Sequence, residues 1–234
     1  MSKPNTTAVI VAGGQGRRMK STRRKQYLVL DGTPVLVRTL AVFNASDLVD
    51  RIVLVVPGQD RTFCMENLVP GAELKKPIDV VSGGQSRQAS VFNGLRTIGG
   101  DDEDLVVIHD AVRPFLKKKH LESCIRGAAE TGACILGLRA FDTVKKVDPG
   151  GCIAATVDRD AIWLAQTPQV FRYRLIMDAH SLARRKGIAG TDDAALLEMA
   201  GHAVRVLPGS RLNIKITTPE DLALATAILK AKLN

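Results

Sequence analysis

The sequence predicts an α/β fold: a single doubly wound, mostly parallel sheet over residues 1–234, from which a β-hairpin over residues 139–160 projects. Strand-like apolar runs alternate along the chain with segments of helical periodicity, which is typical of a parallel sheet covered by helices on both faces. The first run, Ala8–Ala12, carries no polar side chain, as expected for a strand buried on both faces. A composition of 45% hydrophobic and 24% charged residues suits a globular domain with a substantial core.

The alternation assigns each expected element to a range. The expected strands are residues 8–12, 52–56, 79–81, 105–109, 133–138 and 203–207, and the expected helices are residues 35–44, 61–68, 87–98, 118–131, 173–186 and 192–200. A last helix is expected to begin after Thr218, a good N-cap, with Pro219 in its first turn. Because ligands bind beyond the carboxyl ends of the strands in such sheets, the residues that follow each strand are the first candidates for a site.

The segment 139–160 interrupts the alternation. Residues 141–147 and 152–157 are typical of two polar strands around the turn Asp148–Gly151. A two-stranded hairpin is marginally stable alone. We therefore expect this arm to pack against a second subunit, with folding back on its own domain as the alternative. The first possibility predicts a homodimer in which residues 139–160 are the dimerisation element.

The net charge of +9 limits the classes of partner. A basic chain can bind nucleic acid, a membrane surface or small polyanionic substrates. The basic residues are dispersed and only 4% of residues are aromatic, which argues against single-strand binding platforms, and no apolar run is long enough to span a membrane. The four cysteines form no C-x-x-C pair and no secretory signal is visible, so we expect reduced thiols in a cytoplasmic protein. Small polyanions are the expected ligands.

A glycine-rich turn follows the first strand directly. Gly13, Gly14 and Gly16 allow backbone N–H groups to approach a phosphate closely, and six Lys and Arg side chains between residues 17 and 25 would neutralise a triphosphate. No Lys-Ser/Thr pair completes a P-loop, and Met19 stands where the dinucleotide fingerprint needs glycine or alanine. We interpret the turn as a phosphate cradle of another kind.

Further stretches combine a predicted strand end with side chains suited to phosphate or metal chemistry. The stretch 82–91, rich in serine and glycine, follows a strand and opens a helix. Asp110 could bind a hydroxyl or the hydration shell of Mg²⁺, and Arg113 could hold a phosphate with two hydrogen bonds. Lys215 stands between two isoleucines, which suits a strand only if the lysine points into a polar site. His109 could act as a general base, but no nucleophile motif accompanies it, and we favour a structural role.

Together these motifs resemble the 2-C-methyl-D-erythritol 4-phosphate cytidylyltransferase family, nucleotidyltransferases of the non-mevalonate isoprenoid pathway. The matching strings, in chain order, are A-x-G-x-G-x-R-M from Ala12, K-Q-Y-L from Lys25, H-D-A-V-R-P from His109, W-L-A-Q-T-P-Q from Trp163 and N-I-K-I-T-T-P-E-D-L from Asn213. The resemblance covers nearly the whole chain. It implies a Rossmann-like nucleotidyltransferase fold without a fused second enzyme.

The resemblance also implies roles for individual residues. Arg18, Lys25 and Lys215 are implied to be catalytic. The implied nucleotide-binding residues are Ala12, Gly13, Gly14, Gly16, Arg18, Lys25, Gly84, Gln85, Ser90, Asp110, Ala111 and Lys215, with Gly84, Gln85 and Ser90 on the cytosine and Arg87 as framework. The implied substrate-binding residues are Asp110, Arg113, Arg159, Thr167, Thr191 and Lys215. Arg159 would reach the neighbouring subunit's site, and Thr191 could instead be only a helix N-cap. Asp110 is the candidate metal contact, through water.

The implied substrates are CTP and a polyol phosphate, whose oxygen would attack the α-phosphorus of CTP in line and release pyrophosphate, with Mg²⁺ bound mainly through the CTP phosphates. Three alternatives stay open: a ribitol 5-phosphate cytidylyltransferase, which has almost the same motifs, a more distant cytidylyltransferase for an acidic sugar, and a non-catalytic nucleotide- or RNA-binding protein with the same fold. Three positions depart from the family's pattern. Gly13 replaces an alanine, Arg24 replaces the proline before Lys25, and Gln85 stands where many members carry an acid.

Overall fold

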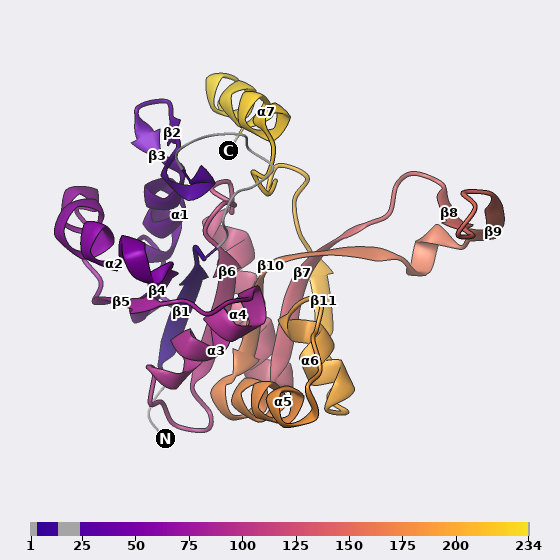
Figure 1. The fold of residues 1–234 in the computed structure, drawn as a ribbon, viewed down its shortest axis with the longest axis horizontal. Coiled ribbons are helices and arrows are strands. Elements are labelled where there is room, and N and C mark those ends of the chain that lie inside the picture. Colours follow the sequence, from indigo (N-terminus) through magenta and orange to yellow (C-terminus); the bar gives the residue numbers. More distant parts are fainter. Residues whose placement is uncertain (1–3, 14–23, 234) are drawn as a thin grey trace.

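A computed structural model of the protein describes residues 4–13 and 24–233. Gly14, Gly16 and Arg18, named above as site residues, therefore lie outside the described part of the chain. The centre is a seven-stranded sheet with the strand order β11-β7-β10-β6-β1-β4-β5 (Figure 1). Its strands are β1 (Thr6–Val11), β4 (Arg51–Val56), β5 (Ile78–Ser82), β6 (Leu105–Asp110), β7 (Ala133–Arg139), β10 (Trp163–Arg172) and β11 (Arg205–Pro208).

The sheet is mostly parallel, as the sequence predicts, and every pairing between its strands is parallel except the two made by β10. The strands expected from the sequence do not include β10, which lies between β6 and β7 near the middle of the sheet. Pro168 has no N–H to donate to a ladder and argues against a central strand. The structure accommodates it at a register shift between Ala165 and Gln169 on the β7 side.

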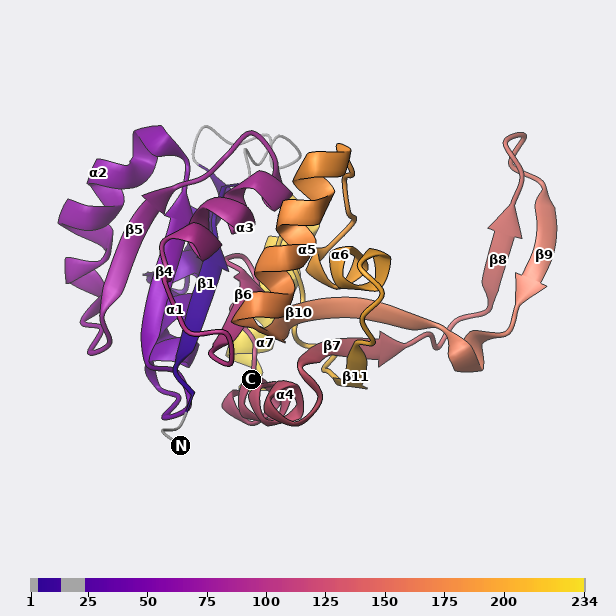
Figure 2. The same cartoon turned by 90° about the horizontal axis from the view of Figure 1, so that it is seen from below.

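Helices cover both faces of the sheet (Figure 2). The helices of the described residues are α1 (Val35–Asn44), α2 (Arg61–Phe63), α3 (Arg87–Arg96), α4 (Lys118–Thr131), α5 (Tyr173–Lys186), α6 (Asp193–Met199) and α7 (Pro219–Lys230), of which α7 packs near β2 and not on a face of the sheet. The two faces follow from the period of two along each strand. In β1, Ala8 and Ile10 belong to the core cluster with α1 and α4, whereas Val9 belongs to the cluster with α3, α5 and α6. No helix in the described part of the chain is long and apolar enough to cross a membrane.

Side chains cap the starts of α3, α6 and α7, and two expectations about the helices need correction. The predicted helix 61–68 is instead the single turn α2 followed by a π-helical turn, η4 (Cys64–Leu68). The N-cap of α6 is Asp192, whose side chain accepts the Ala195 N–H, so Thr191 is not the cap. The last helix begins as predicted, because Thr218 and Asp221 form a capping box around Pro219.

The segment 139–160 contains two antiparallel strands, β8 (Val144–Val147) and β9 (Ile153–Val157), which form a sheet of their own. Both views show this arm extending far from the rest of the chain (Figures 1 and 2). The 3₁₀ turn η6 (Arg159–Ala161) leads back from the arm into β10. The remaining elements are the 3₁₀ turns η2 (Lys25–Tyr27), η3 (Gly58–Asp60) and η5 (Pro70–Ala72), and the short pair β2 (Val29–Leu30) and β3 (Thr33–Pro34).

Candidate active site

A cavity of about 610 Å³ opens beyond the carboxyl ends of β1, β4, β5 and β6. This volume lies within the usual range of small-molecule sites. Eight residues predicted from the sequence line it: Ala12, Gly13, Lys25, Gly84, Gln85, Ser90, Asp110 and Lys215. They come from segments more than 200 residues apart, and the parallel sheet brings them together because it aligns the ends of these strands.

Asp110 is the electrostatic centre of the cavity. Its Oδ2 lies 2.9 Å from Lys215 Nζ and 3.3 Å from Arg113 Nε, and its Oδ1 lies 3.4 Å from Arg87 Nε. Burial alone would raise the pKa of this carboxyl, but Lys215, Arg87 and Arg113 together hold it below its usual range. One carboxylate thus faces three cations, which leaves a net positive charge for an anionic ligand.

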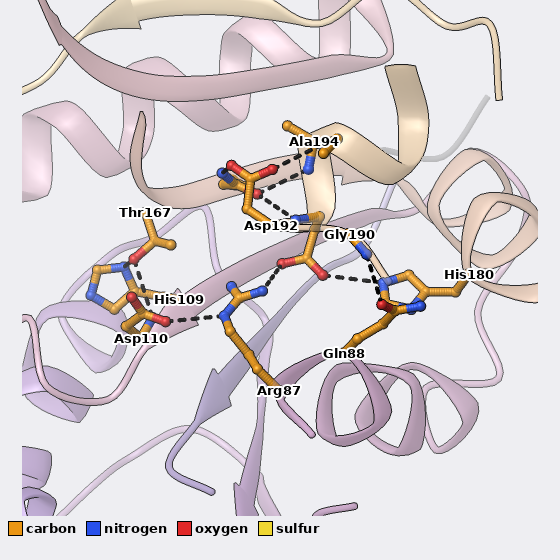
Figure 3. A network of polar contacts seen from close by, with 12 residues as sticks. Arg87, Gln88, His109, Asp110, Thr167, His180, Gly190, Asp192 and Ala194 are labelled. Atoms are coloured by element: carbon orange, nitrogen blue, oxygen red, sulfur yellow. Dashed lines mark hydrogen bonds and ion pairs between the residues drawn. The ribbon is translucent and has the colours of Figure 1, made fainter. Parts of the chain in front are cut away.

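Arg87 also binds a second buried carboxylate, that of Asp193. Figure 3 shows Arg87 between Asp110 on one side and His180 on the other. Arg87 Nη1 lies 2.7 Å from Asp193 Oδ2, and Asp193 Oδ1 lies 3.1 Å from His180 Nε2. Asp193 is only 1% exposed; burial opposes its ionisation, yet Arg87 and His180 hold the Asp193 pKa below its usual value. Arg87 therefore connects the cavity to α5 and α6 and is held at both ends of its guanidinium.

Gln169 on β10 fastens the start of α6 beside this network. Its amide N–H donates to Asp192 Oδ2 at 2.7 Å, and its Oε1 accepts the backbone N–H groups of Asp193 and Ala194, both at 3.1 Å. Figure 3 shows Asp192 and Ala194 above Arg87. Because α6 begins at Asp193, the contact fixes the carboxylate that Arg87 binds.

His109 lies under Asp110 with both ring nitrogens engaged. Its Nε2 is 3.2 Å from the Arg113 carbonyl oxygen, which can only accept, so Nε2 carries the proton. Its Nδ1 accepts a hydrogen bond from the Thr167 hydroxyl at 3.1 Å, and Thr167 Oγ1 in turn accepts the Asp110 backbone N–H. Burial lowers the pKa of His109 to about 4. The ring is neutral at neutral pH and has no free nitrogen, which supports a structural role.

Gly83 and Gly84, in the stretch 82–91, form a second glycine-rich turn, and Ser90 determines its shape. Its hydroxyl accepts the Gly84 N–H at 3.1 Å and donates to the Ser86 carbonyl at 2.8 Å. A Cβ on Gly83 would lie 2.8 Å from Ser90 Oγ, and one on Gly84 would lie 2.5 Å from the Ala89 Cβ. The turn therefore needs glycine at both positions to pack against the start of α3.

Comparison with known proteins identifies the family. The model of the 2-C-methyl-D-erythritol 4-phosphate cytidylyltransferase family matches residues 6–231. The chain is 49% identical over 228 residues to the protein of that name from Syntrophus aciditrophicus, covering 97% of each chain. The chain belongs to this family. This confirms the resemblance noted in the sequence and makes the protein a member of a nucleotidyltransferase enzyme family.

Solved structures of the family share the fold. The chain resembles the crystal structure of 4-diphosphocytidyl-2C-methyl-D-erythritol synthase from Anaerococcus prevotii with a TM-score of 0.83 and 31% identity, covering 97% of this chain and 96% of that one. It resembles the family member from Francisella tularensis with a TM-score of 0.81 and 33% identity, covering 95% and 99%. The α/β nucleotidyltransferase fold predicted from the sequence is confirmed.

Several residues that the family resemblance singles out lie outside the lining of the cavity. Ala111 is fully buried, and Arg113 lies behind Asp110 with its Nη1 2.7 Å from the Asn213 carbonyl oxygen. Thr191 is exposed just before α6. Arg159 lies on the arm, where its Nη1 donates to the Phe141 carbonyl at 2.7 Å. Arg159 therefore does not line the cavity of its own chain.

The described residues do not form a metal site of their own, since no cluster of three or more His, Cys, Asp or Glu side chains among them could hold an ion. The carboxylate in the cavity, Asp110, has both oxygens engaged by cations. This donor set does not fit a divalent ion held by side chains alone. It suits an ion that arrives on the phosphates of a nucleotide.

Proposed function

We propose that this protein transfers the cytidylyl group of CTP to the phosphate of 2-C-methyl-D-erythritol 4-phosphate. An oxygen of the acceptor phosphate forms a bond to the α-phosphorus of CTP, the bond from that phosphorus to the bridging oxygen of the β-phosphate breaks, and pyrophosphate leaves. The product is 4-diphosphocytidyl-2-C-methyl-D-erythritol. The observation that carries the proposal is the cavity at the strand ends, in which Gly13 and the turn at Gly83 and Gly84 meet Asp110 and Lys215 in a chain of this family.

Catalysis in this proposal comes from positioning and charge neutralisation. The acceptor phosphate is already anionic, so no base must remove a proton from it, and neutral His109 is not needed as one. Lys25 and Lys215 would neutralise charge that develops on the α-phosphate and the leaving pyrophosphate. Arg18, outside the described residues, is assigned the same role. Lys215 Nζ, 2.9 Å from Asp110, is supported in its position by that carboxylate.

The remaining contacts follow the family resemblance. Gly84, Gln85 and Ser90 would bind the cytosine at the second glycine-rich turn, and the first turn would hold the phosphates. Asp110 and Arg113 are assigned to the polyol phosphate, together with Thr167, Thr191 and, from the neighbouring subunit, Arg159. Mg²⁺ belongs to the substrate here, since it would enter bound to the phosphates of CTP. Chelation should then stop turnover without changing the melting temperature of the ligand-free protein.

The deciding experiment is pyrophosphate release from CTP and Mg²⁺ with three acceptor conditions: methylerythritol 4-phosphate, ribitol 5-phosphate and none. Turnover on the first alone is the expected result. Turnover only on ribitol phosphate would move the protein to the alternative polyol. Folded protein that binds CTP but is silent with both acceptors would contradict the proposed reaction. RNA retention in a gel-shift assay would favour the non-catalytic alternative, and we expect none.

We also propose a homodimer that forms through the arm at 139–160. Phe141, Val147 and Ile153 expose 52%, 56% and 64% of their surface there. Exposed apolar side chains on a projecting hairpin favour burial against another chain. Sedimentation that shows only monomer at assay concentration would contradict this assembly.

Mixing two inactive variants tests whether Arg159 acts in the neighbouring subunit. A mixed dimer of Arg159→Ala and Lys215→Ala has one site with Lys215 present and an intact Arg159 from the other subunit. If Arg159 acts across the interface, mixing restores part of the activity that both parents lack. If it acts within its own chain, every site stays defective and mixing restores nothing.

A cytoplasmic location is part of the same proposal. All four cysteines of the chain are free, and three of them are buried. Unpaired thiols suit a reducing compartment. Fractionation of cells that produce the protein, with soluble and membrane markers, would test this location.

A further inference from the structure

The segment that carries Lys25 is fastened to the rest of the molecule by its neighbours in sequence. Arg24 Nε lies 3.0 Å from Asp60 Oδ2, and the Tyr27 hydroxyl donates to the same oxygen at 3.0 Å. Between them, the buried Gln26 donates its amide N–H to the Ala12 carbonyl at 2.7 Å. Asp60 thus binds one residue on each side of Lys25, which itself lines the cavity.

Asp60 lies on a segment that is held to the sheet by hydrogen bonds. It ends η3, directly after the carboxyl end of β4, and its N–H donates to the Pro57 carbonyl at 2.8 Å. The next residue, Arg61, donates its Nε–H to the Val80 carbonyl on β5 at 3.0 Å. The carboxylate therefore has a defined position relative to the strand ends that form the cavity.

The contact differs from the surface ion pairs of this protein. Arg24 and Asp60 are 21% and 15% exposed, whereas Lys118 and Asp47, which also form an ion pair, are 46% and 93% exposed. Shielding from water and a second donor on the same oxygen both strengthen such a contact. Burial is the main reason why the pKa of Tyr27 is raised, so the phenol stays a neutral donor at neutral pH.

We propose that Asp60 is a positioning residue for Lys25: by holding Arg24 and Tyr27, it fixes the η2 turn beside the cavity so that Lys25 meets the phosphates of CTP. This inference rests on the role proposed above for Lys25. Asp60 does not contact the reacting atoms in this account. It acts through the backbone of residues 24–27.

The backbone angles of Arg24 show how an arginine can take the place of a more rigid residue before Lys25. Its φ is −64°, which is the value that a proline ring enforces, and its ψ is 140°, which a proline can adopt. In this protein the ion pair between the Arg24 side chain and Asp60 restricts φ of Arg24 instead. Arg24→Pro should therefore keep the segment ordered without Asp60, whereas Arg24→Ala should not.

The experiment compares Asp60→Ala with Asp47→Asn, a matched control in an exposed ion pair away from the cavity. We expect Asp60→Ala to lower kcat on the order of 10-fold to 100-fold, as misplacement of a catalytic group does, with a smaller change in the KM for the acceptor. Arg24→Ala should lose activity in the same way. The control should stay close to the parent protein.

Rescue separates positioning from a general loss of stability. Adding Arg24→Pro to Asp60→Ala should restore most of kcat. The melting temperature should recover less, because the proline does not replace the lost contact between Asp60 and Tyr27. A folded Asp60→Ala variant with the kcat of the control would overturn the inference. So would a folded double variant no more active than Asp60→Ala.

The same variants distinguish this inference from failure of the proposed function. If the parent protein releases no pyrophosphate with either acceptor, the proposed reaction fails and kcat tests nothing further. CTP titration calorimetry with Mg²⁺ then carries the test, because Lys25 would still bind the phosphates. We expect Asp60→Ala, but not Asp47→Asn, to weaken CTP binding on the order of 10-fold. Equal affinities would overturn the positioning role.

Discussion

The cavity at the strand ends and the β8–β9 arm differ in whether their side chains find partners within a single chain. In the cavity, Asp110 binds three cations, and Arg87 is held in turn by Asp193. On the arm, Val147 and Ile153 are more than half exposed. The charges of the cavity are therefore arranged before any ligand binds, whereas the arm lacks a core. Changes in the cavity should alter chemistry and stability, and changes in the arm should alter association.

Removing a cation from the cavity is expected to have the largest effect. Lys215→Ala, and likewise Lys25→Ala, should raise the barrier to cytidylyl transfer by about 3–4 kcal/mol while the fold survives, because a group that stabilises transition-state charge is lost. Steady-state pyrophosphate release measures this loss. Lys119→Ala, which removes an exposed lysine from α4, is the control and should match the parent protein. Near-normal turnover of either site variant would refute its assigned role.

Removing the central carboxylate is expected to have the next largest effect, now on stability. Asp110→Asn leaves Arg87, Arg113 and Lys215 facing one another without the carboxylate. Because these cations keep some contact with water, we expect a loss of about 2 kcal/mol in the free energy of unfolding. Urea unfolding measures it, with Asp47→Asn as the control. An unchanged free energy would mean that the cavity is no better organised than a surface ion pair.

Acidification should lower the free energy of unfolding through the buried groups at the cavity, His109 first. The pKa of His109 is lowered by burial from 6.5 to about 4, so between these values the unfolded chain binds a proton that the folded chain does not. Stability should then fall with falling pH by up to about 1.4 kcal/mol per pH unit in this window. Asp110 and Asp193, whose pKa values are also lowered, add a further loss below about pH 4.

Urea unfolding at several pH values tests this assignment. His109→Gln should flatten the slope between pH 6.5 and 4, although its stability at neutral pH is lower. His202→Gln, which alters an exposed histidine, should keep the slope of the parent protein. Equal slopes in all three proteins would show that His109 is not the buried neutral group.

The arm should show the smallest effect on the stability of a single chain. Ile153→Asp places a charge at a position that is 64% exposed, so the unfolding free energy of the monomer should change by less than about 0.5 kcal/mol. Association should be lost, because the charge would have to be buried against the second chain. Sedimentation velocity tests the second statement. A dimer that persists in Ile153→Asp would place the interface elsewhere.

Local patterns alone determined most of the elements. The apolar runs of β1, β4 and β6 and the periodicity of α1, α4 and α5 place these elements to within two residues, because each depends on side chains close in sequence. The glycine-rich turns and Asp110 could also be selected from the sequence, since each lies at or just after the end of a strand. Lys215 could be selected as a lone cation between two isoleucines, although the structure places it in a loop and not in the strand that this pattern suggested. The order of these motifs was sufficient to indicate the family.

Tertiary structure alone decided the contacts that support the site. Arg87 and Asp193 are 106 residues apart, and Arg24 and Asp60 are 36 apart, so no local spacing relates them. The strand β10 was missed because Gln166 and Pro168 resemble loop residues until β6 and β7 lie on either side. Free energy from packing and pairing between distant segments overrides local preference in such places. The sequence alone therefore determined which residues carry charge, and the fold decided which charges meet.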